Sequence, residues 1–372
     1  MEGHRHRCSI LVAVCIVVSS KGFIPTKSAV SFSMHRTIAA HEDTETADVA
    51  NESFRTPHIT ADGQRALLGA IELMTLSTDA CRIFHGRGGV YPGCEHLTLD
   101  WFPPVLLLTS FKELQKDEVA SYGTALSDRW SLLSQPDNPI NWIYQCRDSS
   151  GPQRANTQLM AGEVPEPHIV SEGDNRYLVH LLRGQNHGLF LDMANGREWL
   201  QQNCCGEKVL NLFAYTCAFS VAALAGGGTE VVNVDMSRGA LSIGKRNHDL
   251  NGLKDSGVAR FLGHNIFKSW GKIRKLGPYG VIVVDPPSYQ KGSFVATKDY
   301  AKIIRRLPSL LRPGGRVLLC LNAPELDTEF LRLQVADAAP QLHFIERLKN
   351  PPNFEVMSPE RALKVLLYEM AE

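Results

Sequence analysis

The apolar positions in the second half of the chain form short unbroken runs, separated by segments with helical spacing. Such runs occupy residues 208–212, 230–235 and 281–284. Strands that are apolar on both faces are typical of a parallel sheet with helices on each side. Ser237 follows the second run as a predicted N-cap, and residues 238–250 have the spacing of a helix. The order of strand, turn, helix and strand predicts an α/β fold with a doubly wound sheet.

The pattern ahead of these runs is different. Apolar residues recur at helical spacing over 61–80, strand-like runs cover 97–108, and a helical period returns over 111–127. This mixture predicts a smaller N-terminal α+β domain at 61–170, followed by the α/β domain at 171–372.

Two of the apolar runs end in a carboxylate, at the edge where open α/β sheets bind their ligands. Asp235 ends one run and is placed to accept hydrogen bonds from ribose hydroxyls. Asp285 ends the other, and Pro286 and Pro287 then stop the strand and fix the turn. A carboxylate beside two proline carbonyls suits the edge of a flat heterocycle or an exocyclic amine. No G-x-G-x-x-G sequence follows residues 208–212, which argues against the usual NAD-binding fingerprint.

Together these segments resemble class I S-adenosylmethionine-dependent methyltransferases, and most closely the bacterial enzymes that methylate 23S ribosomal RNA at cytosine C5 or guanine N7. The resemblance covers residues 82–372 and is carried by the strings NHGLFLDM, LNLFAYTCAFSVAAL, VVNVDMSRGAL, VIVVDPPSY and LLRPGG. It implies a Rossmann-like class I methyltransferase sheet, S-adenosylmethionine as the cofactor and large-subunit ribosomal RNA as the partner.

The resemblance also implies which residues bind the cofactor. Asp235 would hold the ribose, and Asn265, where the family usually has Asp, would accept a hydrogen bond from the adenine amine. The family's turn after the first strand usually carries glycine where this chain has Cys217 and Ala218, so we expect less room beside the cofactor. The residues expected to bind the cofactor are Phe190, Asp192, Asn211, Phe213, Tyr215, Thr216, Asp235, Met236, Asn265, Ile266 and Asp285.

The target atom depends on the strand after Gly314 and Gly315. Cytosine C5 is a poor nucleophile, so enzymes that methylate it first add a cysteine thiolate to the base. In the C5 relatives that this chain resembles, a cysteine follows this strand, and by register its position is that of Asn322. The guanine-N7 relatives have Asn at the same position. Cys320 lies deeper on the same strand face, and we interpret it as a buried apolar residue. A ring or exocyclic nitrogen is therefore favoured as the target, with cytosine C5 as the alternative. The residues expected to hold the base are Asp285, Pro286, Pro287, Tyr289, which would stack on it, and Asn322.

The net charge of the chain and the placing of its basic residues bear on whether its partner is a nucleic acid. Lysine and arginine number 39 and so do aspartate and glutamate, and this balance is mild evidence against extensive phosphate binding. Two basic clusters flank the Asp-Pro-Pro turn, and contact with an RNA backbone is an open prediction for both. They are Lys298, Lys302, Arg305 and Arg306, and Lys268, Lys272, Arg274 and Lys275.

The resemblance leaves RNA recognition to the α+β domain. The C5 relatives carry an additional RNA-binding domain ahead of it, and the residues before position 61 are too few for one.

A methyltransferase of small molecules or proteins, and a non-catalytic RNA-binding module, remain as alternatives. The sequence leaves the oligomeric state open, with a homodimer as one alternative.

The nine cysteines have neither the spacing of a metal site nor that of a disulfide framework. We therefore expect a reduced chain without a bound metal.

The start of the chain has the pattern of a targeting leader. No acidic residue occurs between Glu2 and Glu42, residues 9–18 are apolar but too short to span a bilayer, and residues 26–40 are rich in Ser and Thr. This order predicts a leader over 1–40, and it resembles the bipartite leaders of proteins sent to plastids bounded by extra membranes. An acidic, polar linker would follow at 41–60. Secretion, and a cytoplasmic protein that begins at Met34, are the alternatives.

Overall fold

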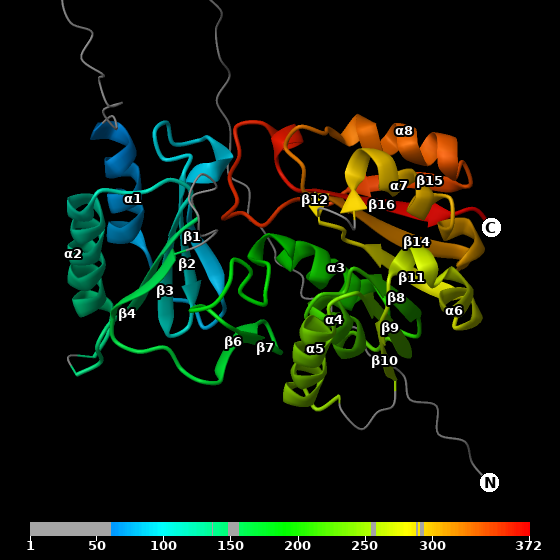
Figure 1. Cartoon of the computed structure of the whole chain (residues 1–372), viewed down its shortest axis with the longest axis horizontal. Helices are drawn as coiled ribbons and strands as arrows, with labels where there is room; N and C mark the ends of the chain where they lie inside the picture. The colour runs from blue at the N-terminus through cyan, green and yellow to red at the C-terminus, as the bar shows by residue number, and fades with distance from the viewer. Residues whose placement is uncertain (1–60, 136, 148–155, 254–257, 288, 291–293) are drawn as a thin grey trace, which may run out of the picture. The chain divides into compact units, whose positions relative to one another are not determined.

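The computed structural model describes residues 61–372, apart from 136, 148–155, 254–257, 288 and 291–293 (Figure 1). The predicted leader at 1–40 and linker at 41–60 lie outside the described residues.

The first sheet has five strands in the order β1-β2-β3-β4-β5. Helices α1 (Ala61–Leu73) and α2 (Lys116–Leu133) pack on one of its faces through a shared apolar core. The strands predicted over 97–108 are confirmed, but the second helix begins five residues later than the spacing from 111 predicted. It begins there because Gln115 and Glu118 form a capping box, in which the Gln115 N–H donates to the Glu118 carboxylate at 2.9 Å. The strands are β1 Cys81–His85, β2 Leu97–Phe102, β3 Val105–Ser110, β4 Asn141–Cys146 and β5 Asn156–Ala161.

The second sheet has seven strands in the order β10-β9-β8-β11-β14-β16-β15. All run parallel except β16, which is antiparallel to both of its neighbours. The predicted doubly wound α/β class and the three predicted strands are confirmed. The bounds are β8 Lys208–Leu212, β9 Glu230–Asp235, β10 Ala259–Gly263, β11 Tyr279–Val284, β14 Leu311–Leu321, β15 Leu342–Arg347 and β16 Lys364–Met370.

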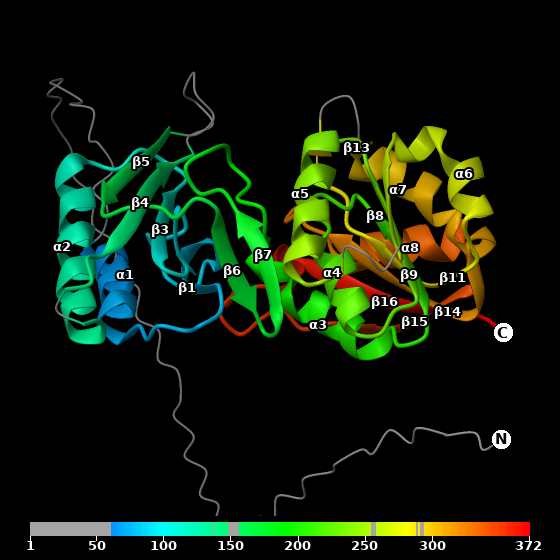
Figure 2. The ribbon, with the colours of Figure 1, turned by 90° about the horizontal axis from the view of Figure 1, so that it is seen from below.

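Helices cover both faces of this sheet (Figure 2). Helices α3, α4 and α5 pack on one face and α6, α7 and α8 on the other. The residues 281–284 of β11 are therefore fully buried, and each such side chain contributes about 1.5–3 kcal/mol to stability. The helices are α3 Ala194–Asn203, α4 Ala218–Ala225, α5 Arg238–Leu250, α6 Trp270–Lys275, α7 Ala296–Ile304 and α8 Thr328–Ala338.

Two hairpins complete the described fold. Strands β6 (His168–Glu172) and β7 (Asn175–Val179) share an apolar core with the first sheet and with α4. Strands β12 (Tyr289–Gln290) and β13 (Phe294–Val295) follow β11. None of the helices in the described part of the chain is both long and apolar enough to cross a membrane.

The strand order reverses between β8 and β11, which are neighbours in the second sheet. The chain moves from β8 to β9 and β10 on one side, and then returns to β11 on the other. Such a switch point opens a crevice at the carboxyl ends of the strands, where doubly wound folds bind ligands. Residues at the ends of β8, β9, β10, β11 and β14 therefore meet at one edge.

Candidate active site

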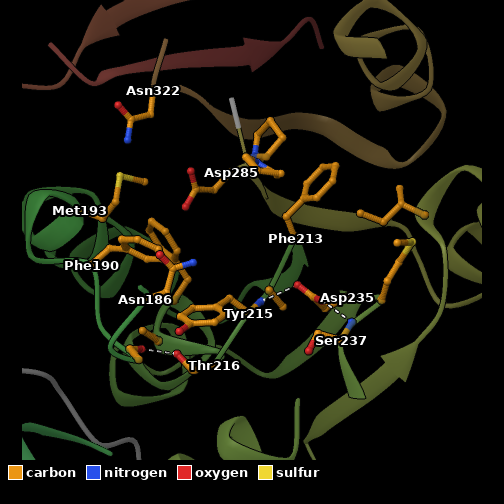
Figure 3. A pocket seen from close by; sticks show the side chains of 18 of the residues that line it. Asn186, Phe190, Met193, Phe213, Tyr215, Thr216, Asp235, Ser237, Asp285 and Asn322 are labelled. Carbon is orange, nitrogen blue, oxygen red and sulfur yellow. Dashed lines mark hydrogen bonds between the residues drawn. The ribbon is translucent and has the colours of Figure 1, made fainter. Parts of the chain in front are cut away.

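A pocket of about 570 Å³ lies at this edge, which is within the size range of small-molecule sites (Figure 3). Figure 3 shows Asp235 toward one end of it, and Asp285 and Asn322 toward the other. The predicted site residues that line the pocket are Phe190, Asp192, Phe213, Tyr215, Thr216, Asp235, Met236, Asn265, Ile266, Asp285, Pro286, Pro287 and Asn322.

The carboxylate of Asp235, the last residue of β9, fixes the turn that follows β8. One oxygen accepts the Tyr215 N–H at 2.8 Å and the other accepts the Ser237 N–H at 2.7 Å. Each carboxylate oxygen can accept a further hydrogen bond. The side chain can therefore hold two neighbouring hydroxyls and the protein backbone at the same time.

The turn after β8 has an unusual backbone. Phe213, Tyr215 and Cys217 all have positive φ, at 59°, 47° and 62°. Such values are uncommon outside glycine, and they persist where surrounding contacts hold the chain in place. Here the Tyr215 N–H is held by Asp235, and the Thr216 hydroxyl donates to the carbonyl of Gly188 at 2.5 Å. The pocket wall is therefore built from a conformation that the tertiary structure imposes.

Of the two residues expected to reduce the room beside the cofactor, Ala218 lines the pocket and Cys217 does not. The Cys217 side chain is fully buried against α5. A Cβ added to Gly244 of α5 would lie 2.5 Å from the Cys217 Sγ, so glycine at 244 makes the space for this sulfur. The room that the thiol needs is thus taken from the helix packing and not from the cofactor side.

Asn265 supplies an acceptor without a partner. Its Oδ1 is buried and forms no hydrogen bond with any described residue. An unpaired buried acceptor costs about 1–3 kcal/mol, which a ligand N–H can recover. Ile266 and Met236 line the same pocket and offer apolar surface. An exocyclic amine on a flat ring fits this arrangement, and the cis-hydroxyls of a ribose fit Asp235, so the residues present fit S-adenosylmethionine.

The opposite end of the pocket is acidic. Burial raises the pKa of Asp285 to about 7, the Asp192 carboxylate raises that pKa further, and the Arg197 guanidinium opposes the shift. Burial also raises the pKa of Asp192. Arg197 is only 3% exposed, and it donates to both oxygens of Glu172 at 2.6 Å. Two carboxyl groups of raised pKa in one pocket favour a cationic ligand, such as a sulfonium or an ammonium.

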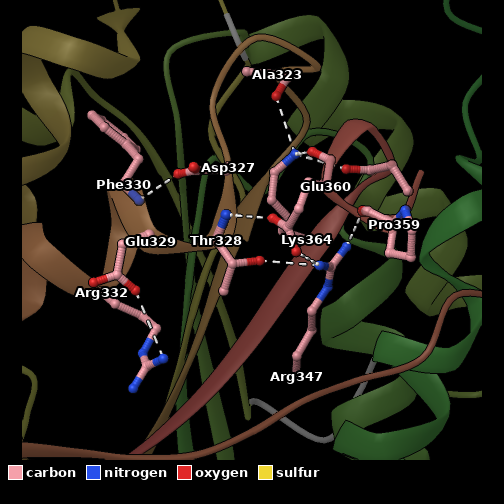
Figure 4. Close-up of polar contacts among 11 residues, drawn as sticks. Ala323, Asp327, Thr328, Glu329, Phe330, Arg332, Arg347, Pro359, Glu360 and Lys364 are labelled. Carbon is pink, nitrogen blue, oxygen red and sulfur yellow. Dashed lines mark hydrogen bonds and ion pairs between the residues drawn. The ribbon is translucent and has the colours of Figure 1, made fainter.

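A buried lysine ties the end of β14 to the start of β16 (Figure 4). Lys364 is fully buried, and its ammonium donates to the carbonyls of Ala323, Glu360 and Ala362 at 3.1, 2.6 and 2.9 Å. Burial lowers the pKa of Lys364. Because these bonds use all three donors of the ammonium, they fix the backbone next to Asn322 and Leu363, which line the pocket. Asn322, which precedes Ala323, is positioned in this way.

Two predicted site residues are not placed in the pocket. Asn211 is 1% exposed, and its amide donates to Asn233 Oδ1 at 2.9 Å inside the sheet. Asn211 therefore does not line the pocket, because its amide is held by Asn233, whose own amide donates to Ser220 of α4; its contact with the cofactor stays a prediction. Tyr289 lies in β12, but its side chain is outside the described residues, as is Ser288.

The sequence reasoning missed several residues of the pocket. Asn186 and Met193 are the ends of the NHGLFLDM string, so that string was a usable signal for both. Phe267 directly follows the predicted Asn265 and Ile266, whereas Arg197 and Leu363 had no comparable signal. None of the eight residues of the two basic clusters lines the pocket. Within the described chain, no three His, Cys, Asp or Glu side chains are grouped as metal ligands.

The chain matches a protein-family model described as S-adenosylmethionine-dependent methyltransferase over residues 81–369. It is 33% identical over 256 residues to the Ribosomal RNA large subunit methyltransferase I of Aeromonas hydrophila, a match that covers 66% of this chain and 62% of that relative. It is 30% identical over 293 residues to the protein of the same name from Erwinia tasmaniensis, covering 75% of this chain and 71% of the relative. The match with the first relative thus spans less than two thirds of its length.

Solved structures show the same fold. A candidate methyltransferase crystallised as a complex with SAH has a TM-score of 0.68 at 24% identity, covering 82% of this chain and 79% of its own. The SAM-dependent methyltransferase from Agrobacterium tumefaciens has a TM-score of 0.57 at 18% identity, covering 80% of this chain and 92% of its own.

Proposed function

Because the chain belongs to the S-adenosylmethionine-dependent methyltransferase family, we propose that it methylates a base of large-subunit ribosomal RNA at a ring or exocyclic nitrogen. The relatives from Aeromonas and Erwinia, which are named as large-subunit ribosomal RNA methyltransferases, support the substrate class. S-adenosylmethionine supplies an electrophilic methyl group as a sulfonium. The protein then has to hold the base in line with it. We expect Asp285, the Pro286 carbonyl and Asn322, which line the pocket, to do so.

The observation that carries the choice of nitrogen is that no described cysteine lines the pocket. Cys320 is fully buried in β14, and burial raises the pKa of its thiol well above the ordinary value, with the Asp285 and Asp192 carboxylates adding to the shift. A thiol of raised pKa is a poor source of thiolate. At the position facing the pocket stands Asn322, which can hydrogen-bond a base but cannot form the covalent adduct that C5 methylation needs.

Cys320→Ala is therefore expected to keep its turnover within about twofold of the wild type. Its free energy of unfolding should fall by about 1 kcal/mol, because a small buried apolar group is lost. Methyl transfer to ribosomal RNA and thermal unfolding would be measured on the same preparation. Loss of turnover in a folded Cys320→Ala protein would instead support the cytosine-C5 mechanism.

Mass spectrometry of ribosomal RNA nucleosides tests the proposal directly. Large-subunit RNA would be treated with the protein and S-adenosylmethionine carrying an isotopically labelled methyl group. We expect the label on a base nitrogen of one nucleoside. Label on cytosine C5 would select the C5 alternative, and label only on protein or small molecules would exclude the RNA substrate. If no label transfers although calorimetry shows RNA binding, the chain is a binding module.

We also infer a plastid location from residues 1–40, with the cytoplasm as the alternative. The charged start, the short apolar run and the hydroxyl-rich, acid-free segment support it. Residues 1–60 fused to a fluorescent protein should direct it to the organelle, whereas the protein from residue 61 onward should not enter. A reporter that stays in the cytosol would contradict the targeting role.

A further inference from the structure

A second cavity of about 750 Å³ adjoins the pocket. Its walls come from the first sheet and from the 350–363 segment ahead of β16. It shares Asn186, Phe190, Asp192, Asn322 and Leu363 with the pocket. A ligand whose reacting atom lies beside Asp285 can therefore extend into this second cavity.

Arginines outnumber the acids that line the second cavity by four to three. Arg82, Arg87, Arg147 and Arg361 line it, beside the acids Glu95, Asp100 and Asp192. Arg82 is already neutralised, because its guanidinium donates to both oxygens of Asp100 at 2.7 and 3.0 Å. Among the described residues, no carboxylate forms an ion pair with Arg87 or Arg147. Arg361 also forms none of the ion pairs found among the described residues, so three guanidinium charges are left, and two of them, those of Arg87 and Arg147, lie beside one aromatic ring.

The side chains that accept hydrogen bonds from Arg147 are neutral. Arg147 donates to the Gln145 amide oxygen and to His187 Nε2, the latter at 2.8 Å. A guanidinium can only donate, so Nε2 of His187 carries no proton and the ring is uncharged. Burial and the Arg147 charge lower the pKa of His187 to about 4. His187 therefore orients Arg147 and adds no charge of its own.

Phe111 brings the two arginines together. The guanidinium of Arg87 lies 3.9 Å from the centre of the Phe111 ring, and that of Arg147 lies 5.8 Å from it. Stacking on a ring fixes the orientation of a guanidinium without neutralising it. Burial lowers the pKa of Arg147 to about 10. The Asp100 carboxylate opposes this shift and the charges of Arg82 and Arg87 add to it, and Arg147 stays protonated at neutral pH. Cations held this close together favour an anion between them.

We propose that Arg87 and Arg147, oriented by Phe111, bind a phosphodiester of the RNA beside the target nucleotide. This assignment rests on the proposed function. The planar fork of arginine matches a phosphate, and cavity continuity places such a phosphate next to a base held at Asp285 and Asn322. The zero net charge of the chain does not oppose it, because two unneutralised guanidinium groups suffice for one phosphodiester.

The salt dependence of RNA binding tests the proposal. The full chain, saturated with S-adenosylhomocysteine, would be titrated with a fragment of large-subunit RNA at several salt concentrations. Arg87→Ala and Arg147→Ala should each weaken binding on the order of tenfold and reduce the salt slope by about one. The double variant should lose about two units of slope. Affinity for S-adenosylhomocysteine should not change, and turnover at saturating RNA should fall little, since phosphate contacts position the substrate.

Two further variants sharpen the test. Arg332→Ala is the matched control, because Arg332 also stacks on a ring, Phe344 at 5.0 Å, but lies on α8 outside both cavities. It should bind RNA as the wild type does. Arg147→Lys keeps the positive charge but loses the planar guanidinium that can bond a phosphate through two N–H groups. It should bind RNA more weakly than the wild type but with the same dependence on salt concentration.

The possible failures can be told apart. A double variant with wild-type affinity and slope would overturn the phosphate assignment while leaving the proposed function intact. A wild-type protein that binds no large-subunit RNA would overturn both. If guanosine monophosphate bound as tightly as the RNA fragment, the ligand of Arg87 and Arg147 would be the phosphate of a free nucleotide, and the assignment of an RNA phosphodiester would be overturned.

Discussion

Asp285→Ala is expected to lower the rate of methyl transfer by a factor of about a hundred or more, while affinity for S-adenosylhomocysteine stays within about twofold of the wild type. The carboxylate lies at the end of the pocket opposite Asp235, where a base and not the nucleoside part of the cofactor would be held. Losing it removes the acceptor for the base edge. Single-turnover kinetics and calorimetry on the same protein separate the two effects. A parallel loss of cofactor affinity would mean that Asp285 belongs to the cofactor site.

The raised pKa of Asp285 gives this prediction a second readout. With a pKa of about 7 in the folded protein and an ordinary value in the unfolded chain, the folded state keeps its proton to higher pH. Stability contributed by this residue is therefore highest below about pH 4 and falls as pH rises to about 7. Asp285→Asn cannot ionise, so its melting temperature should exceed that of the wild type by a few degrees at pH 8 and match it near pH 4.

The same pKa sets the pH dependence of the wild-type reaction. If the ionised carboxylate binds the base, the rate at low RNA concentration should rise with pH and level off at or above about pH 7. A cation bound in the pocket favours the ionised carboxylate, so the rate would then level off at a lower pH. Asp285→Asn should show no such rise. A residual rate of Asp285→Asn that follows the wild-type pH profile would assign the titration to another group, with Asp192 as the first candidate.

The strands and helices around the site could be predicted from local patterns. The segments 208–212, 230–235 and 238–250 have the predicted bounds, because unbroken apolar runs and the Ser237 cap depend on neighbours in sequence. Ser237 accepts the Ala240 N–H at 3.2 Å as an N-cap should. Sequence reasoning placed the start of α2 too early. The apolar spacing from 111 does not reveal which polar residue caps the first turn of the helix.

The positions of side chains depend on contacts that no local pattern contains. The family resemblance assigned Asn211 to the cofactor site, but its amide pairs with Asn233 on the neighbouring strand. Lys364 bonds the carbonyl of Ala323, 41 residues away in sequence. Arg87, Phe111 and Arg147 come from three separate segments and meet only in the folded chain. The basic clusters that the sequence did reveal line neither cavity.

Asp235→Ala is expected to weaken the binding of S-adenosylmethionine on the order of ten- to a hundredfold. The carboxylate lies at the end of β9, accepts two backbone N–H groups and still has acceptors for the ribose hydroxyls. Its loss also frees the Tyr215 N–H and so loosens the turn with three positive-φ residues. Calorimetry with S-adenosylhomocysteine measures the change. Asp235→Asn, which keeps one acceptor, should lie between the wild type and Asp235→Ala.

Asp327→Ala is the matched control for this experiment. Asp327 likewise accepts a backbone N–H, that of Phe330 at 2.8 Å, but it caps α8 away from the pocket. Both alanine variants should lose about 0.5–2 kcal/mol of stability, as cap residues do, yet only Asp235→Ala should lose cofactor affinity. Equal affinities for all variants would show that the ribose is not held at Asp235.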